Sequence, residues 1–158
     1  MDDDMVDGVK VMVVRPGEEP ELTRIEPDSS GSYLSALQEL VGGYIEAFDP
    51  LFGDEPLIWV NEEGLSNRSM PNRAVYANKR MEEIGYISQM DYSTVVKEGD
   101  LYSVLFGTFV AAAYDLEGDI RDLSDDEVSR VNGTFGGIES IISGHLEVQR
   151  ILSRRHHR

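Results

Sequence analysis

The chain has 158 residues, of which 30 are acidic and 14 are lysine or arginine, so its formal net charge is −16. It contains no cysteine, which excludes disulfides, thiolate nucleophiles and cysteine-based zinc sites. A surface this anionic repels phosphate backbones and anionic lipids, so direct nucleic-acid binding is not expected.

The length fits one domain with some appended structure. No run of about 18 apolar residues is present, so no membrane-spanning helix is expected. The acidic start, MDDDMVDG, lacks the positive charge of a secretory signal. With the absence of cysteine, these features predict a cytoplasmic protein.

Three interpretations of the acidic excess stay open. The acids can form a solvated face that keeps the protein soluble. They can match a basic partner. They can also be an adaptation to molar salt, where charges are screened within about 3 Å. The scarcity of lysine, with only Lys10, Lys79 and Lys97, agrees with the third.

The chain begins with a predicted β-hairpin. Val9, Val11 and Val13 alternate with other side chains, which is strand periodicity, and a Pro- and Gly-rich turn leads into a second strand, so residues 9–26 predict the hairpin.

A helix is predicted at residues 32–43, with Ser32 as N-cap and Gly42 in the left-handed conformation that ends a helix. Its apolar stripe is Tyr33, Leu37, Leu40 and Val41. Strands are predicted at 44–48 and around Trp59, the latter buried on both faces. Short connections between such elements indicate one sheet with the helix packed across it.

The second half of the chain predicts one long strand and two helices. Residues 103–114 are the longest apolar run and predict a central strand, with a bulge or close approach at Gly107. A turn and a short return strand follow. Ser124 and Glu127 form a capping box that starts a helix ending near residues 132–133. The last helix has the predicted stripe Ile138, Ile141, Ile142, His145 and Leu152.

These elements predict an α+β fold: a mixed, mostly antiparallel sheet with a packed helix, a β-β-α-β-β-like start and C-terminal helices. The predicted division is a sheet domain at 8–123 and a helical extension with a basic tail at 124–158. The final helix is a candidate surface for homo-oligomer formation.

Several stretches occur in an order that resembles the DUF3846 family, small proteins of phages, plasmids and their prokaryotic hosts. They are VVRPGEEPEL, LQELVGGYIEAF, WVNEEG, PNRAVY and FGTFVAA. The resemblance covers about residues 8–125 and skips residues 78–100, which read as an insertion. It implies an α+β fold and mobile-element ancestry, with the host cytoplasm as the location if the protein is viral. It implies no catalytic residues.

The segment SMPNRAVYANK, residues 69–79, is the candidate ligand site because it carries Arg73 and Lys79 and no acid. Asn72 and Arg73 could offer donors to an anion, with Tyr76 as a stacking face. Alternatively, the segment covers the core, and the same two side chains satisfy backbone carbonyls.

No catalytic or metal site is predicted. The three histidines lie on the last helix or in the tail, so no Ser–His–Asp triad can come from the body of the fold. They are His145, His156 and His157. The acidic stretch from Asp115 has isoleucine where a calcium loop needs its sixth-position glycine, and no phosphate-binding glycine motif is present. No cofactor is expected.

The sequence favours a non-enzymatic acidic accessory protein that acts by protein contact with a basic surface, with DNA mimicry in antidefence as one form of it. A nucleotide-like ligand binder or enzyme using residues 72–76 and a salt-adapted oligomerisation module are the competing functions.

Overall fold

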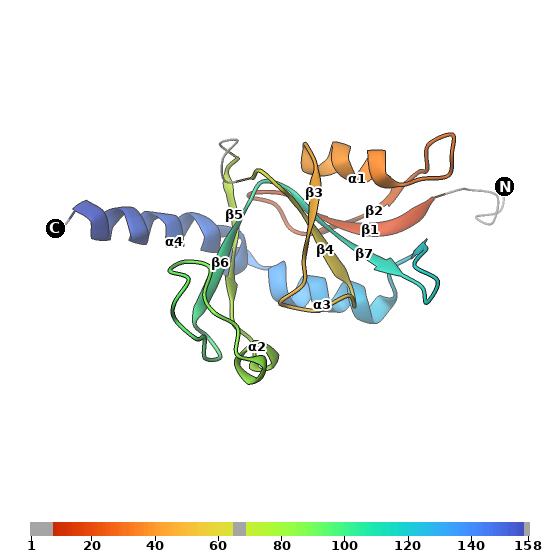
Figure 1. Cartoon of the computed structure of the whole chain (residues 1–158). Helices are drawn as coiled ribbons and strands as arrows, with labels where there is room; N and C mark the ends of the chain where they lie inside the picture. The colour runs from red at the N-terminus through yellow and green to blue at the C-terminus, as the bar shows by residue number, and fades with distance from the viewer. Residues whose placement is uncertain (1–7, 65–68, 157–158) are drawn as a thin grey trace.

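A computed structural model describes residues 8–64 and 69–156. Its strands and helices, in chain order, are β1 Val9–Val14, β2 Glu21–Ile25, α1 Leu34–Val41, β3 Ile45–Phe48, β4 Leu57–Asn61, β5 Pro71–Tyr76, α2 Lys79–Ile84, β6 Leu101–Phe106, β7 Phe109–Tyr114, β8 Ile120–Arg121, α3 Asp125–Phe135 and α4 Ile138–His156. The predicted α+β class is confirmed, with antiparallel sheets and C-terminal helices (Figure 1).

The main sheet has the strand order β2-β1-β7-β4-β3, and β8 pairs with β7. All of its pairings are antiparallel. The predicted hairpin is confirmed, with Val9 opposite Ile25 and Val13 opposite Glu21. The predicted short return strand is also confirmed as β8.

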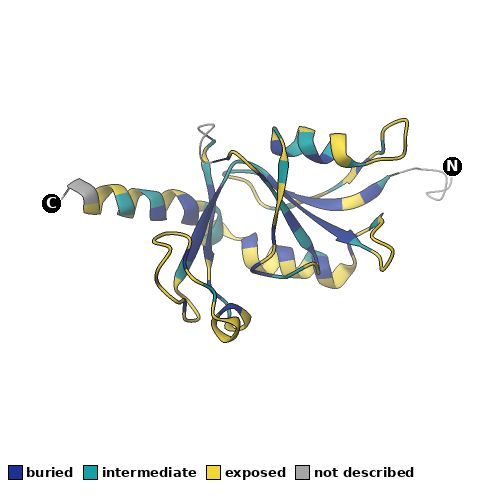
Figure 2. Cartoon of the chain, in the orientation of Figure 1, coloured by how far each residue is buried: buried dark blue, intermediate teal, exposed yellow. Residues whose placement is uncertain are grey.

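Helices cover both faces of the main sheet, α1 on one and α3 on the other (Figure 1). Because side chains alternate along a strand, β1 supplies both cores. Val11 and Val13 pack towards Leu37 of α1, while Met12 and Val14 belong to the core that includes Phe135 of α3. The buried strands at the centre stand out in Figure 2.

The predicted central strand at 103–114 is wrong as a single element. The run is broken at Gly107, whose φ is 74°, a left-handed value that favours glycine. The part before it, β6, pairs with β5 in a separate two-stranded sheet, while β7 occupies the middle of the main sheet. The apolar run therefore serves two sheets, which its composition cannot reveal.

Helix ends follow the predicted capping chemistry in part. Gly42 ends α1 with φ of 81°, as predicted, but the N-cap is Tyr33, one residue later than predicted, and the Ser32 hydroxyl accepts the Leu34 N–H instead. The capping box of Ser124 and Glu127 is confirmed. The predicted stop near residues 132–133 is wrong, because α3 continues to Phe135, whose ring is buried in the core.

Candidate functional site

The first candidate surface is the PNR segment at the start of β5. The Asn72 side chain is fully buried, and its Nδ2 donates to the carbonyls of Val14 at 2.9 Å and Gly107 at 2.8 Å. One amide thus ties β5 to the end of β1 and to the break between β6 and β7. These contacts join the small sheet to the main sheet.

Arg73 is also fully buried, and its guanidinium donates to three backbone carbonyls and one side chain. Nε donates to Phe135 O at 3.0 Å, Nη1 to Arg15 O at 3.3 Å and to Asn72 Oδ1 at 2.8 Å, and Nη2 to Glu18 O. The Phe135 carbonyl lies at the end of α3, where the helix dipole favours a cation. Burial lowers the pKa of Arg73, and the nearby charge of Glu19 opposes that change.

Tyr76, the third residue of the predicted ligand site, lies elsewhere. Its ring is partly exposed and its hydroxyl donates to Glu147 Oε2 on α4 at 2.7 Å. The structure brings Asn72 and Arg73 together, with their donors directed at protein oxygens, and it places Tyr76 at the junction with α4. These contacts agree with the alternative interpretation of residues 69–79, in which the segment covers the core and its polar side chains satisfy backbone carbonyls.

Alkaline unfolding should report the Tyr76–Glu147 contact. Burial, followed by the hydrogen bond to Glu147, raises the pKa of Tyr76 from 10.0 to about 12. The folded state therefore holds the proton more tightly than the unfolded state, so this contribution to stability is complete below pH 10.0 and is lost as the pH rises to about 12. We expect Tyr76→Phe to lose less stability than the wild type over this window in urea titrations followed by Trp59 fluorescence. Equal losses would contradict the contact.

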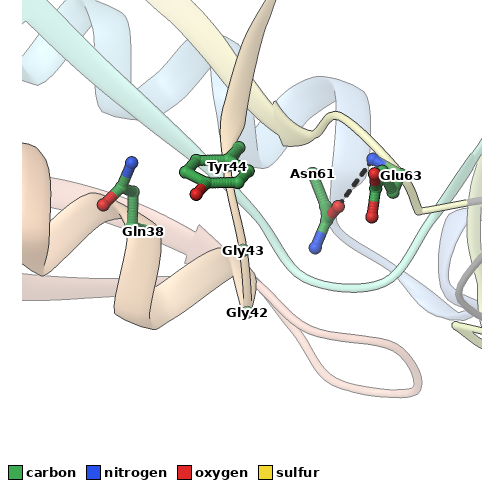
Figure 3. A pocket seen from close by; sticks show the side chains of 6 residues that line it. All are labelled: Gln38, Gly42, Gly43, Tyr44, Asn61 and Glu63. Carbon is green, nitrogen blue, oxygen red and sulfur yellow. Dashed lines mark hydrogen bonds between the residues drawn. The ribbon is translucent and has the colours of Figure 1, made fainter.

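A shallow pocket of about 270 Å³ lies where α1 ends beside β3 and β4 (Figure 3). Its lining residues are Gln38, Gly42, Gly43, Tyr44, Asn61 and Glu63. Buried Asn61 donates to Val41 O at 3.0 Å, and its Oδ1 accepts the Glu63 N–H at 2.7 Å. The amide thus closes the helix end and the following turn, which explains this hollow without a ligand. The sequence predicts Gly42 only as the end of the helix.

The segment predicted as an insertion, residues 78–100, has two faces. Met81 and Val96 are buried in the core, and Ser88 is buried with its hydroxyl donating to Leu101 O at 3.1 Å. The outer face exposes large apolar side chains, with exposed fractions of 38% to 80%. We call this set the apolar apex: Ile84, Ile87, Met90, Tyr92 and Val95.

The backbone of the apolar apex is held in place. Ile87 and Val95 form an antiparallel bridge, so their side chains lie on the same side. Tyr92 has φ of 55°, a conformation that non-glycine residues rarely adopt, and its N–H donates to Ser88 O at 2.9 Å. Asp91 fixes the tip by accepting hydrogen bonds from Thr94 and Ser93. These bonds, the Thr94 hydroxyl first, lower the pKa of Asp91 to about 2.

The segment of the apolar apex carries acids, with basic residues at its two ends, Lys79 and Arg80 before it and Lys97 after it. Residues 81–96 contain Glu82, Glu83 and Asp91 and no lysine or arginine. Across the described ranges, the structure has three salt bridges, and none involves these acids. The apolar apex therefore has an apolar centre with acidic side chains near it. The sequence signal that could have found this surface was the cluster of large apolar residues within a polar segment.

The second candidate surface is α4, whose predicted stripe lies mostly outside the core. Ile138, Ile142 and Leu152 are exposed by 69%, 41% and 49%, His145 is exposed, and only Ile141 of the predicted stripe is partly buried. The face against β5 carries Ser143, Gly144 and Glu147 instead, all of them buried.

The physical reason is close backbone contact along β5. The Ser143 hydroxyl accepts the Ala74 N–H at 2.9 Å, which satisfies a donor on the strand edge not paired with β6. A Cβ added at Gly144 would lie 2.9 Å from the carbonyl carbon of Asn72, so only glycine allows this approach. Isoleucine side chains have no room here, and the apolar stripe of α4 therefore faces solvent.

Nothing in the described part of the chain suggests a metal centre or a membrane span. No group of three or more histidines, aspartates and glutamates that could hold a metal ion occurs there. No helix within residues 8–64 and 69–156 is long and apolar enough to cross a membrane.

Comparison with known proteins finds one family model, described as a domain of unknown function (DUF3846), which matches residues 9–136. The matched range includes β1 to α3 and with them the PNR segment and the apolar apex. No curated protein and no solved structure matches the chain.

Proposed function

The chain belongs to the DUF3846 family, and we propose that it is a non-enzymatic accessory protein that acts by contact with a basic protein. The observation that carries this proposal is the apolar apex, with the ring of Tyr92 held outward at 80% exposure on a fixed loop. Rigid, exposed aromatic side chains are typical anchors of protein interfaces. Large apolar patches on a soluble surface mark interaction sites.

The chemistry of the partner follows from the surroundings of the apolar apex. The apex needs a hydrophobic pocket for Tyr92 and for the Ile87–Val95 pair. Its nearby carboxylates lack lysine or arginine partners within the described chain, so lysine and arginine around that pocket would pair with them. A nucleic-acid-binding protein of the host has such a surface. Antidefence by DNA mimicry, encoded by a phage or plasmid and exerted in the host cytoplasm, is the form of this function that we favour.

A selection from phage-displayed random peptides on the immobilised full chain tests the proposal. We expect enriched peptides to combine an aromatic or branched apolar residue with lysine or arginine, and to bind more weakly as salt rises. Tyr92→Asn should abolish their binding, because asparagine tolerates the left-handed backbone and removes only the ring. Tyr44→Asn is the matched control, since Tyr44 is 70% exposed at another site. Peptides without basic residues, or peptides that bind Tyr92→Asn equally, would refute the proposal.

Small-ligand binding at residues 72–76 is the competing function from another class. A ligand that binds only the folded state raises its melting temperature by mass action. A shift with one member of a nucleotide panel, absent in Tyr76→Phe, would favour this alternative, whereas the contact function predicts no shift.

Salt adaptation predicts a different response. A chain adapted to molar salt should unfold in dilute buffer and recover its circular dichroism spectrum in molar KCl, because screening removes repulsion among its acids. If the fold is equally stable in dilute buffer and in molar KCl, salt adaptation does not account for the acidic residues, and contact with a basic partner is favoured.

Self-association through α4 belongs to the same contact function. The outward stripe of the helix is a second apolar surface, and it lies on a different element from the apolar apex.

A further inference from the structure

The outward stripe of α4 consists of four branched side chains that the fold leaves uncovered: Ile138, Ile142, Leu146 and Leu152, each exposed by 40% or more. At about 3.6 residues per turn they lie on one face of the helix, with His145 and Gln149 among them. The face that contacts β5 is nearly opposite. An amphipathic helix that directs its apolar face away from its own core is built to pack against another surface.

The distribution of charge identifies what that surface is. Residues 1–137 contain 28 acids and 10 bases, whereas residues 138–158 contain 2 acids and 4 bases. Two copies of this protein repel one another over most of their sequence, and the segment that contains α4 is where that repulsion is weakest, because its net charge is only +2 against −18 for residues 1–137. Docking of α4 on the body of another copy, outside the apolar apex, would place the apolar stripe against acidic surface, so the stripe of a second copy is the better match.

We propose that α4 forms a two-fold symmetric, antiparallel helix pair with α4 of a second copy. The proposal rests on the contact function above and names the partner for this helix. In such a pair Ile138 lies near Leu152 of the second copy, and His145 lies near the two-fold axis. Each apolar residue of the stripe is then covered by the same stripe, which is how a self-complementary interface works.

Charges on one flank of α4 support the antiparallel direction. Glu139 and Arg150 are eleven residues apart, close to three helical turns, so both lie along the same side of the stripe. An antiparallel pair brings Glu139 next to Arg150 of the second copy, and the symmetry repeats that pairing. The Arg150 side chain is 64% exposed and uses Nη1 for Glu147 within its own chain, which leaves most of its donor fork accessible. A parallel pair would place this flank against the opposite flank of the second copy, so Glu139 and Arg150 of different copies would not meet.

Sedimentation of the full chain at several concentrations tests whether the pair forms. We expect a monomer–dimer equilibrium in the micromolar range, because one helix pair is smaller than an obligate interface. Ile142→Glu should weaken dimerisation at least tenfold and leave the melting temperature nearly unchanged, since the side chain is on the surface. Leu116→Glu is the matched control, because Leu116 is fully exposed in the turn between β7 and β8. A monomer at every concentration, or a dimer unaffected by Ile142→Glu, overturns the proposal.

Single cysteines test the direction of the pair, because the chain has none of its own. Under mild oxidation His145→Cys should cross-link to itself near the two-fold axis. Ile138→Cys should not, because the two copies of residue 138 are about 20 Å apart in this register, but it should cross-link to Leu152→Cys when the two variants are mixed. Self-cross-linking of Ile138→Cys overturns the antiparallel geometry.

The proposal of contact through the apolar apex and the proposal of dimerisation through α4 can each be refuted without the other. Ile142→Glu leaves the apolar apex intact, so a chain that remains monomeric can still select basic peptides. Tyr92→Asn leaves α4 intact, so loss of peptide binding does not affect sedimentation.

Discussion

Replacing Arg73 by methionine is expected to remove about 4 kcal/mol from the free energy of unfolding, a large part of the roughly 5–15 kcal/mol that stabilises a typical native protein. Methionine fills much of the volume but donates no hydrogen bond. The carbonyls of Phe135, Arg15 and Glu18 would then lose their Arg73 donor. Each buried polar group left unsatisfied costs about 1–3 kcal/mol.

Urea unfolding followed by the fluorescence of the single tryptophan, Trp59, measures this loss. Arg24→Met is the control, because Arg24 is exposed and donates to one carbonyl, that of Gly8, at 3.2 Å. It should change stability by less than about 0.5 kcal/mol. Arg73→Lys should fall between the two, since an ammonium cannot reproduce the fork of a guanidinium. A loss under about 1 kcal/mol for Arg73→Met would mean that water replaces the donors, and our account of the PNR segment would be wrong.

Gly144→Ala has the second large expected effect, a net loss of about 2 kcal/mol. The new Cβ would meet three backbone atoms of β5, the carbonyl carbon and oxygen of Asn72 at 2.9 and 3.0 Å and the Arg73 nitrogen at 3.0 Å. Backbone atoms cannot move aside as a flexible side chain does, so α4 must shift away from β5. Overpacking of this kind costs about 1–3 kcal/mol or more, and the better helix propensity of alanine returns up to about 1 kcal/mol.

The control for this substitution is Gly133→Ala within α3. A Cβ there meets nothing within 4 Å, so only the propensity term remains and stability should rise by about 1 kcal/mol. Limited trypsin digestion adds a local measurement, because a displaced α4 exposes the bonds after Arg150 and Arg154. If the two glycine variants behave alike, close contact between α4 and β5 is not what requires Gly144.

Local chemistry made several elements predictable. The alternation of Val9, Val11 and Val13 predicted β1, and Gly42 predicted the end of α1, because strand periodicity and the left-handed helix end depend on neighbouring residues only. The capping box of Ser124 and Glu127 is equally local. The division of the chain at residue 123 stays a prediction, and α3, which follows it, contributes Val131 and Phe135 to the core of the sheet.

The roles of the singled-out polar residues depended on distant partners. Nothing near Arg73 in the sequence indicates that its donors reach the turn between β1 and β2 and the end of α3, 62 residues away. The apolar stripe of α4 was recognisable, but its direction was not, because that depends on whether a partner face leaves room for isoleucine. The β5 edge leaves room only for Gly144 and small or polar neighbours.

By itself, the sequence indicated the β1–β2 hairpin, α1, the capping box that starts α3, the family and the excess of negative charge, because these follow from composition or from motifs that can be read along the chain. Only the tertiary structure decided which apolar residues form the core and which face outward, and which cations are buried. Those outcomes depend on packing and hydrogen bonding between segments that are far apart in the chain.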